Sequence, residues 1–255
     1  MIYGLYLSSS GTMATMHAQD AIANNLANVD TAGFKRQMAI FQERPTPRRT
    51  DPSRAGDPML DRIGGGLAVA PSSWDMSQGT VEDSGGPLDV ALVGNGYLAV
   101  RDQQNNLRLT RNGTLMVDRQ GFLAMANTPG NRVLDWQQRP IRLGDVPQTR
   151  VAISKDGAIT DGDLPIARLG LFDVADPRSL TPVGNSLFSP RNQSDPRSTD
   201  RVTVMQGYIE KSNVDPAREL TRMIEMQRLL EANANFIRYQ DQTLARAVNE
   251  LGKIG

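Results

Sequence analysis

The chain has 255 residues, with 28 Lys plus Arg against 28 Asp plus Glu, one histidine and no cysteine. With His17 as the single histidine, the sequence excludes thiol nucleophiles, iron–sulfur clusters, zinc fingers and sites built from several histidines. The zero net charge argues against a nucleic-acid partner, because phosphate binding needs a basic surface. No apolar run approaches the ~20 residues of a membrane-spanning helix, so the composition predicts a soluble chain.

The N-terminal segment from Ile2 to about Leu26 contains no proline and predicts a helix. A heptad pattern of alternating three- and four-residue steps runs through it and includes Leu5 and Met16. Half of the positions in this pattern are small or polar, so the helix needs a partner. Asn28 and Gly33 then favour a turn. The segment lacks the basic and apolar regions of a cleavable secretory signal.

Residues 36–80 are predicted to form an extended linker. The stretch from Phe41 to Gly66 is rich in proline, arginine, aspartate and glycine, a composition typical of connectors. Its five arginines are accompanied by four acidic residues, so a basic arm for nucleic acid is the weaker interpretation.

Short apolar runs separated by turn residues fill the centre of the chain. They begin at Leu88 and alternate with turns such as Gly94-Asn95-Gly96 and Asn112-Gly113, a spacing that predicts hairpins in series. Further runs up to Ile209 raise the expected count to about eight strands or more. An antiparallel β-domain over residues 81–206 is the expected result.

The C-terminal segment predicts one long helix. Asp215 is a good N-cap, Pro216 suits the first helical position, and neither proline nor glycine recurs before Gly252. A helix of 36 residues from Pro216 to Leu251 would be roughly 54 Å long. A heptad pattern again predicts a coiled coil. Its large apolar members are Leu220, Met223, Leu230, Ile237, Leu244 and Leu251.

Candidates for chemistry are few. The Gly94 to Gly96 turn is not a phosphate-binding loop, and no nucleophile elbow accompanies His17. Three aspartates weakly resemble a calcium cage without the EF-hand spacing, and two acidic pairs resemble the two-carboxylate arrangement of glycosidases. These residues are Asp156, Asp161 and Asp163 for calcium, and Glu82 with Asp83 or Asp173 with Asp176 for the acidic pairs. We expect ordinary turns and loops at all of them, no metal, no cofactor and no enzymatic activity.

Three separated blocks resemble the bacterial flagellar rod and hook proteins, and together they cover nearly the whole chain. The first, IANNLANVDTAGFKR, spans Ile22 to Arg36. The second comprises PLDVALVGNGYLAV and LTRNGTLMVDRQGFL, and the third is GYIEKSNVD, ending at Asp215. One departure is Tyr97-Leu98, where relatives often carry paired phenylalanines. The signature residues so identified are Asn24, Asn25, Leu26, Asn28, Thr31, Gly33, Phe34, Lys35, Glu210, Ser212, Asn213 and Val214.

The resemblance implies an axial structural subunit of the flagellar basal body, with the proximal rod protein favoured over the distal one or another hook–basal body protein. Such subunits leave the cytoplasm through the flagellar type III export apparatus without a cleaved signal. They polymerise with themselves and with other rod and hook proteins into a helical shaft that crosses the periplasm and transmits torque. Neither nucleic acid nor a membrane-spanning segment is involved.

The expected fold is therefore α+β, with long N- and C-terminal helices forming a coiled-coil-like module and a central antiparallel all-β domain. The expected domains are 1–35 for the N-terminal helix and signature turn, 36–80 for the linker, 81–206 for the β-domain and 207–255 for the C-terminal helix. Two functions of other classes remain as alternatives, a periplasmic binding module and a carbohydrate hydrolase.

Overall fold

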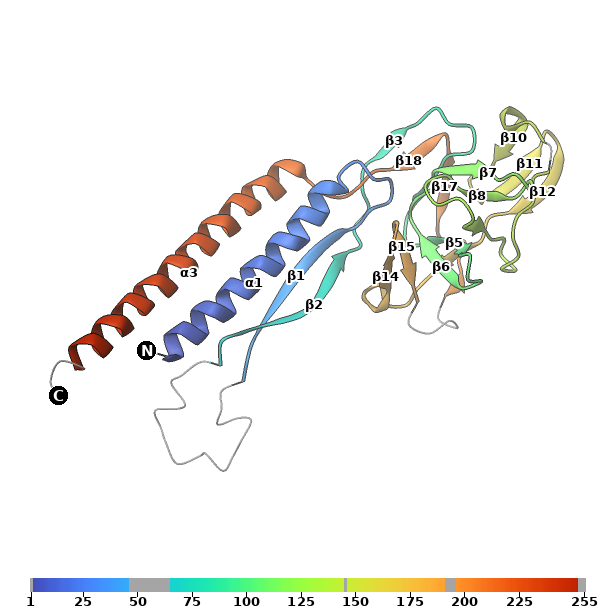
Figure 1. Cartoon of the computed structure of the whole chain (residues 1–255). Coiled ribbons are helices and arrows are strands. Elements are labelled where there is room, and N and C mark those ends of the chain that lie inside the picture. The colour runs from blue at the N-terminus through green and yellow to red at the C-terminus, as the bar shows by residue number, and fades with distance from the viewer. Residues whose placement is uncertain (1, 46–64, 145, 191–195, 252–255) are drawn as a thin grey trace, which may run out of the picture. The chain divides into compact units, whose positions relative to one another are not determined.

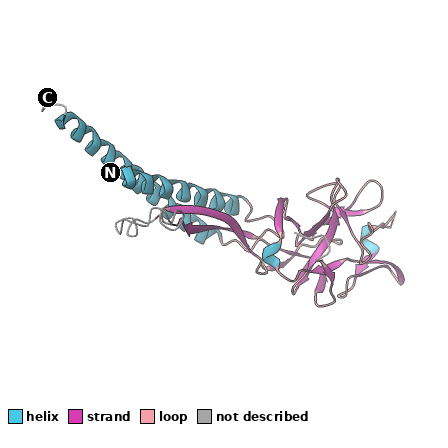
Figure 2. Ribbon diagram, turned by 90° about the horizontal axis from the view of Figure 1, so that it is seen from below, coloured by secondary structure: helices cyan, strands magenta, loops and turns pink. Residues whose placement is uncertain are grey.

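A computed structural model describes residues 2–45, 65–144, 146–190 and 196–251 of the chain. These residues form two compact units, and each unit combines segments that are distant in sequence. The helical unit contains Met1–Ala27, Gln37–Trp74 and Asp215–Gly255, whereas the β unit contains Asn28–Arg36 and Asp75–Val214. Figure 1 shows the elements of each unit in their order along the chain, and Figure 2 shows the same elements by type of secondary structure.

The described elements confirm an α+β chain. The helical unit holds α1 (Ile2–Ala27), β1 (Arg36–Glu43), β2 (Leu67–Asp75) and α3 (Pro216–Leu251), except for the end residues Arg36 and Asp75, which belong to the β unit. The first half of the β unit holds β3 (Val81–Asp83), β4 (Val90–Val93), β5 (Tyr97–Arg101), β6 (Leu107–Thr110), β7 (Leu115–Val117), β8 (Leu123–Met125) and β9 (Arg132–Val133). The second half holds η3 (Gln148–Arg150), β10 (Val151–Ile153), β11 (Ala158–Asp161), β12 (Leu164–Arg168), β13 (Leu171–Asp173), η4 (Pro177–Ser179), β14 (Thr181–Gly184), β15 (Leu187–Ser189), β16 (Arg197–Ser198), β17 (Thr203–Gln206) and β18 (Tyr208–Glu210).

Both long helices begin and end close to their predicted bounds. At the start of α3, the Oδ1 atom of Asp215 accepts hydrogen bonds from the backbone N–H groups of Ala217 and Arg218. This N-cap satisfies two of the donors that a helix N-terminus leaves without partners inside the helix. In α1, the hydroxyls of Ser8 and Thr15 donate to carbonyl oxygens four residues earlier. Small polar residues therefore fit inside α1 without leaving buried donors unpaired.

The two helices pack against each other in antiparallel orientation. A Cβ atom on Gly4 would lie 2.4 Å from the Gln240 amide nitrogen, and one on Gly11 would lie 3.3 Å from that of Asn233. At the other end of α1, Asn25 donates a hydrogen bond to Glu219. The contacts on both helices recur in multiples of seven residues. Glycines in α1 thus permit a close approach of the two backbones at the level of polar side chains on α3.

Part of the predicted linker is ordered β structure. Strands β1 and β2 pair with each other, and the backbone N–H of Arg44 donates to the Gly66 carbonyl at 2.8 Å. A Cβ atom on Gly66 would lie 3.0 Å from the Ser10 hydroxyl, so this ribbon packs against α1. The alternating side chains of β1 and β2 favour strands, whereas the composition of residues 41–66 favoured a connector. Much of that composition comes from residues 46–64, which lie outside the described residues.

The β unit is antiparallel in every pairing that the structure defines, as predicted. Its largest sheet has the order β14-β15-β6-β5-β9-β8-β7, with β13 and β16 joined to it beside β5. Strands β10, β11 and β12 form a separate sheet, and the pairs β17-β4 and β18-β3 complete the unit. Apolar side chains from most of these strands share one core, including Leu92, Leu98, Leu123 and Ile159, each 0% exposed.

Two predicted hairpins do not form. The strands on either side of Asn112-Gly113 pair elsewhere, β6 with β5 and β15 and β7 with β8. The other is the turn after β4. The sequence suggested that Gly94-Asn95-Gly96 joins two paired strands, but β4 pairs with β17, where Val90 lies opposite Gln206 and Val93 opposite Thr203. A Cβ atom on Gly96 would lie 2.4 Å from the Val202 side chain. The turn therefore carries the chain from the β4–β17 ribbon into the large sheet, and its glycine permits the close approach of the segment before β17.

Candidate functional site: a buried charge cluster at the signature turn

The signature turn of the β unit depends on Gly33. Its φ of 65° lies in the left-handed region, and its N–H donates to the Glu210 carbonyl at 2.7 Å. A Cβ atom at this position would lie 2.3 Å from the backbone nitrogen of Asn112. Both the backbone conformation and the neighbouring backbone therefore require glycine. The buried Phe34 follows, and Thr31 closes the turn through hydrogen bonds with Asn28.

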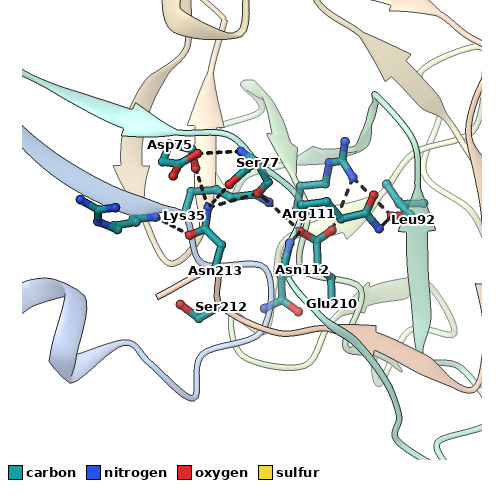
Figure 3. Close-up of polar contacts among 12 residues, drawn as sticks. Lys35, Asp75, Ser77, Leu92, Arg111, Asn112, Glu210, Ser212 and Asn213 are labelled. Atoms are coloured by element: carbon teal, nitrogen blue, oxygen red, sulfur yellow. Dashed lines mark hydrogen bonds and ion pairs between the residues drawn. The ribbon is translucent and has the colours of Figure 1, made fainter. Parts of the chain in front are cut away.

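Lys35 and Glu210 form a buried ion pair at the centre of the site (Figure 3). The Lys35 Nζ atom lies 2.6 Å from Glu210 Oε1 and donates to the Ser77 carbonyl, also at 2.6 Å. The Lys35 side chain is 1% exposed and that of Glu210 is 0% exposed. Glu210 Oε1 also accepts the N–H of Gly79 at 2.9 Å. Segments on either side of the β-domain sequence are thereby joined through charged, water-excluded contacts.

Arg111 adds a second cation to this cluster. Its Nη1 atom lies 3.4 Å from Glu210 Oε2, and its Nη2 atom donates to the Gly94 carbonyl at 2.6 Å. The guanidinium also lies over the Tyr97 ring, 5.1 Å from its centroid. A planar guanidinium is suited to this site because it can serve several acceptors and an aromatic face together.

Burial dominates the electrostatics of the cluster, in which two cations share one carboxylate. Burial lowers the pKa of Lys35 below its ordinary value, against the raising effect of Glu210, and the positive charge of Arg111 lowers it further. Burial likewise raises the pKa of the Tyr97 hydroxyl. Removal of one partner would leave a buried charge without compensation, which costs far more than the loss of an exposed ion pair.

Asn213 joins the C-terminal signature to the same region (Figure 3). Its Nδ2 atom donates to the carbonyls of Asp75 and Ser77 at 2.8 and 3.1 Å, and its Oδ1 atom accepts the Arg36 N–H at 2.8 Å. The neighbouring Ser212 hydroxyl accepts the N–H of Val214, which is itself buried. Burial acts to raise the pKa of Asp75, but hydrogen bonds from Ser77 and nearby cations outweigh it, so the pKa is lowered. The side chains of Asn213, Ser212 and Asp75 therefore bind mainly backbone groups, an arrangement that fixes the backbone conformation of this region.

Asn25 has the corresponding role within the helical unit. Its side chain is 1% exposed, accepts the N–H of Gln37 at 2.8 Å and donates to the Gln37 carbonyl at 2.9 Å. Its Nδ2 atom also lies 3.2 Å from the Oε2 atom of Glu219, a residue that is 2% exposed. Arg222 donates to the other oxygen of Glu219 at 3.0 Å. Asn25 therefore connects α1, β1 and α3, while the exposed Asn24 donates to the Gln37 side chain and Leu26 is half-buried.

The predicted heptad residues lie in different environments. Met223, Leu230, Ile237 and Leu244 of α3 are half-buried, as is Leu5 of α1. By contrast, Met16 is 53% exposed and Leu220 is 48% exposed, and the side chain of Leu251 lies outside the described residues. The contacts between the helices also use Gly4, Gly11 and Asn25, which lie outside the positions of the predicted heptad pattern.

A second set of apolar side chains on the helical unit faces solvent. Met13 is 66% exposed, Phe236 is 58% exposed and Tyr239 is 68% exposed. Exposed apolar residues on a strand ribbon of the same unit include Phe41 and Val69. Single exposed apolar residues are normal, but a concentration of them along two helices and a ribbon is typical of a surface that becomes buried on assembly.

The acidic candidates for chemistry lie in ordinary structural contacts. Glu82 pairs with Lys211 at 3.1 Å, Asp161 pairs with Arg150 at 2.9 Å, and Asp156 hydrogen-bonds Ser154. Asp173 and Asp176 bind backbone N–H groups of their own loops. Within the described ranges, three or more His, Asp or Glu side chains are nowhere grouped as they would be to hold a metal ion. Within the same ranges no helix has both the length and the apolar character needed to cross a membrane.

Several residues of the site were missed from the sequence. Arg111 and Asn112 stand in a block that was interpreted as a turn, and Ser77 and Gly79 stand in the expected linker. Glu219 resembled an ordinary charge in the first turn of a helix. The one sequence signal for the site was the position of Arg111, a cation between an apolar strand and a turn. This position alone does not predict that Arg111 is buried, because its burial arises from contacts with distant segments.

These features define a structural protein whose terminal helices pair and whose signature residues stabilise a β-domain. Three family models match the chain. "Flagella basal body rod protein" matches residues 5–35, "Flagellar hook protein FlgE/F/G D1 domain" matches 91–161, and "Flagellar basal body rod FlgEFG protein C-terminal" matches 205–250.

Flagellar basal-body rod proteins of two kinds, FlgF and FlgG, are similar to the chain over nearly its whole length. The flagellar basal-body rod protein FlgF of Caulobacter vibrioides is 30% identical over 251 residues, which covers 98% of each chain. The rod protein FlgG of Buchnera aphidicola is 28% identical over 263 residues, which covers 96% of this chain and 98% of that protein. The rod protein FlgG of Bacillus subtilis is 28% identical over 267 residues, which covers 98% of this chain and 99% of that protein. The chain belongs to the flagellar basal-body rod protein family.

Proposed function

We propose that the chain is a structural subunit of the flagellar rod, which polymerises into a helical shaft and transmits torque to the hook and filament. The observation that carries this proposal is the exposed apolar surface of the helical unit, which includes Met13, Met16, Phe236 and Tyr239. A head-to-tail contact that does not close into a ring generates a helical polymer, and such a contact needs a surface of this kind.

The helical unit acts as a coiled-coil-like axial module in this proposal. Contacts between α1 and α3 recur at heptad spacing, for example from Gly4 to Gly11 opposite Gln240 and Asn233. Of the predicted heptad residues, Met223, Leu230, Ile237 and Leu244 are half-buried, whereas Leu220 and Met16 are exposed. We assign the two exposed residues to contacts between subunits, while the glycine-lined face forms the contact within a subunit.

The charge cluster holds the β unit in one conformation under load. Lys35, Arg111 and Glu210 lie in a water-excluded site, where an ion pair is difficult to exchange for water. Because their polar atoms are engaged with protein groups, the cluster is suited to a structural role without catalysis.

The chain is proposed to act in the basal body, in the part of the rod that crosses the periplasm. It would arrive through the flagellar type III export apparatus without a cleaved signal, and its partners would be other copies of itself and other rod and hook proteins. The chain length of 255 residues and the short segment that follows Phe41 favour the proximal over the distal rod.

The direct test is deletion of the gene in its host, followed by electron microscopy and mass spectrometry of purified basal bodies. A rod subunit predicts that the protein co-purifies with basal bodies and that deletion removes hooks and filaments. Complementation with the wild-type gene is the control. Intact flagella in the deletion strain, together with absence of the protein from basal bodies, would reject the proposal and favour a periplasmic binding module.

A further inference from the structure

Three arginines lie on one face of the large sheet in the β unit. Arg101 of β5 lies directly opposite Arg132 of β9, and Arg132 lies opposite Ala124 of β8. Two residues before Ala124, Phe122 lies opposite Arg142 in an isolated bridge. Side chains opposite each other in an antiparallel pair share a face, as do side chains two residues apart on one strand. The register therefore places all three guanidinium groups on the same side.

Only one of these arginines has an acidic partner within the described residues. Arg132 lies 3.1 Å from the carboxylate of Asp118, hydrogen-bonds Gln120 and lies over the Phe122 ring at 4.1 Å from its centroid. Its position and orientation are thus fixed. Like charges directly opposite each other in a sheet are destabilising, so the placement of Arg101 beside Arg132 is costly without an anion.

Arg101 is half-buried and its donors are only partly used. Its Nη2 atom donates to the Gln138 carbonyl at 3.0 Å, whereas its Nε atom is buried and has no hydrogen-bond partner in the part of the chain that the structure describes. Arg142 is exposed and makes no ion pair with a described residue. Asp102, the acidic side chain beside Arg101, is already engaged by Asn106 and Arg108.

A pocket of about 360 Å³ lies beside these groups. Arg101, Arg132 and Asp102 line it together with polar residues that include Gln103 and Asn105. Its size suits a small group such as a phosphate or a side-chain carboxylate. A guanidinium presents several donors in one plane, which is the arrangement that binds oxyanions through two parallel hydrogen bonds.

We propose that Arg101 and Arg132, with Arg142 on the same face of the sheet, form an oxyanion-binding site on the β unit. The ligand is a group with two or more oxygens that share a negative charge. Two sources supply such a group, a free phosphate and a carboxylate on a second copy of this chain. The site is independent of the buried cluster at Lys35 and of the assembly surface on the helices.

The first experiment uses inorganic phosphate as the probe. Phosphate is titrated into the purified full chain at constant ionic strength, and the Nε–H resonances of the arginines are followed by NMR. We expect saturable shifts at Arg101 and Arg132. Arg101→Gln and Arg142→Gln should each weaken phosphate binding about tenfold. Arg178→Gln is the control. It removes one positive charge at an exposed position of η4 and should leave the affinity for phosphate unchanged.

The second experiment separates the two sources. Self-association of the full chain is measured by sedimentation with and without phosphate, for the wild type and for Arg142→Gln, which is exposed and therefore suited to retain the fold. If phosphate and the substitution both weaken self-association, the ligand is a carboxylate of a second copy. If phosphate binds and self-association is unchanged, the ligand is a free oxyanion. If phosphate does not bind, or binds equally well to Arg101→Gln and Arg142→Gln, and Arg142→Gln self-associates as the wild type does, the proposal is overturned.

Discussion

The Lys35 ammonium lies 2.6 Å from the Glu210 carboxylate, although 175 positions separate the two residues in sequence. One residue follows the signature turn and the other ends β18, shortly before the C-terminal helix. Their ion pair therefore links the first and last segments of the β unit, and its burial makes that link strong. Segments 28–36 and 75–214 form one unit partly through this contact.

Loss of this pair should destabilise the β unit far more than loss of an exposed pair. Lys35→Met leaves the fully buried Glu210 with Arg111 as its remaining cation, at 3.4 Å, and we expect a cost of about 3–5 kcal/mol in the free energy of unfolding. Lys211→Met removes the exposed pair with Glu82 and should cost less than about 1 kcal/mol. Urea unfolding of the full chain, followed by hydrogen exchange of the β-unit core, measures both. Equal effects of the two substitutions would contradict a structural role for the cluster.

Gly33 and Gly85 provide a matched pair for the close approach at the signature turn. Their φ angles are 65° and 66°, so alanine costs about 1–2 kcal/mol of backbone strain at either position. At Gly33 the added Cβ would also lie 2.3 Å from the Asn112 nitrogen, whereas at Gly85 it would meet nothing within 4 Å. Overpacking should therefore add roughly 1–3 kcal/mol for Gly33→Ala alone. Thermal unfolding of both variants measures this difference. Indistinguishable melting temperatures would show that the close approach of Gly33 to the Asn112 backbone does not limit the side chain at this position.

Local signals predicted most of the regular elements. Asp215 and Pro216 specify the start of α3, because capping and proline geometry act within one helical turn. Alternating apolar runs likewise located β5, β7 and β8. The bounds of these elements depend on residues that are neighbours in the chain, so they can be predicted from the sequence alone.

Contacts between distant segments were beyond the local patterns. The pairing of β4 with β17 replaced an expected hairpin, and Val202, just before β17, lies close to Gly96 although the two are 106 positions apart in sequence. The heptad pattern also did not single out Gly4 and Gly11, which face Gln240 and Asn233 of α3. Small residues such as Gly11 permit closer backbones than large apolar residues do, and a hydrophobic pattern gives them no weight. The signature positions were found through the family resemblance, whereas the partners that surround Lys35 needed the fold.

The seam of α3 can be tested at Ile237. This side chain is half-buried in the helical unit, so Ile237→Asp places a charge where the helices pack and should abolish motility. The β unit should keep its cooperative melting, because Ile237 belongs to the other unit. Gln242→Asp, at an exposed position of the same helix, introduces the same charge and should leave swimming intact. Swimming-plate assays with calorimetry of the purified variants measure both outcomes, and normal swimming of Ile237→Asp would remove the seam from the mechanism.

The exposed heptad residues should matter for assembly and not for the monomer. Met16→Glu and Leu220→Glu change side chains that are 53% and 48% exposed, so the melting temperature of the purified chain should change little. Incorporation into basal bodies should nevertheless fall strongly, because each substitution places a charge in the proposed contact between subunits. Immunoblots of purified basal bodies, normalised to total protein in the cell, provide the measurement. Normal incorporation of both variants would assign the polymer contact to another face.

Acid should weaken the β unit through Asp118. Burial acts to raise the pKa of this carboxyl, but hydrogen bonds from Phe122, Gln120 and Arg132 outweigh it and hold the pKa below its ordinary value of 3.8. A lowered pKa in the folded state stabilises the fold above the ordinary value, and this stabilisation is lost as the pH falls through 3.8 towards the lowered pKa.

Asp118→Asn should therefore cost about 1–2 kcal/mol at pH 7, and its difference from the wild type should shrink as the pH falls below 3.8. Asp163→Asn, at an exposed position, removes the same charge and serves as the control. Calorimetry of the three proteins between pH 7 and pH 2.5 measures these differences. A difference between Asp118→Asn and wild type that stays constant across this range would mean that the carboxylate charge contributes nothing, and that only the shape of the loop matters.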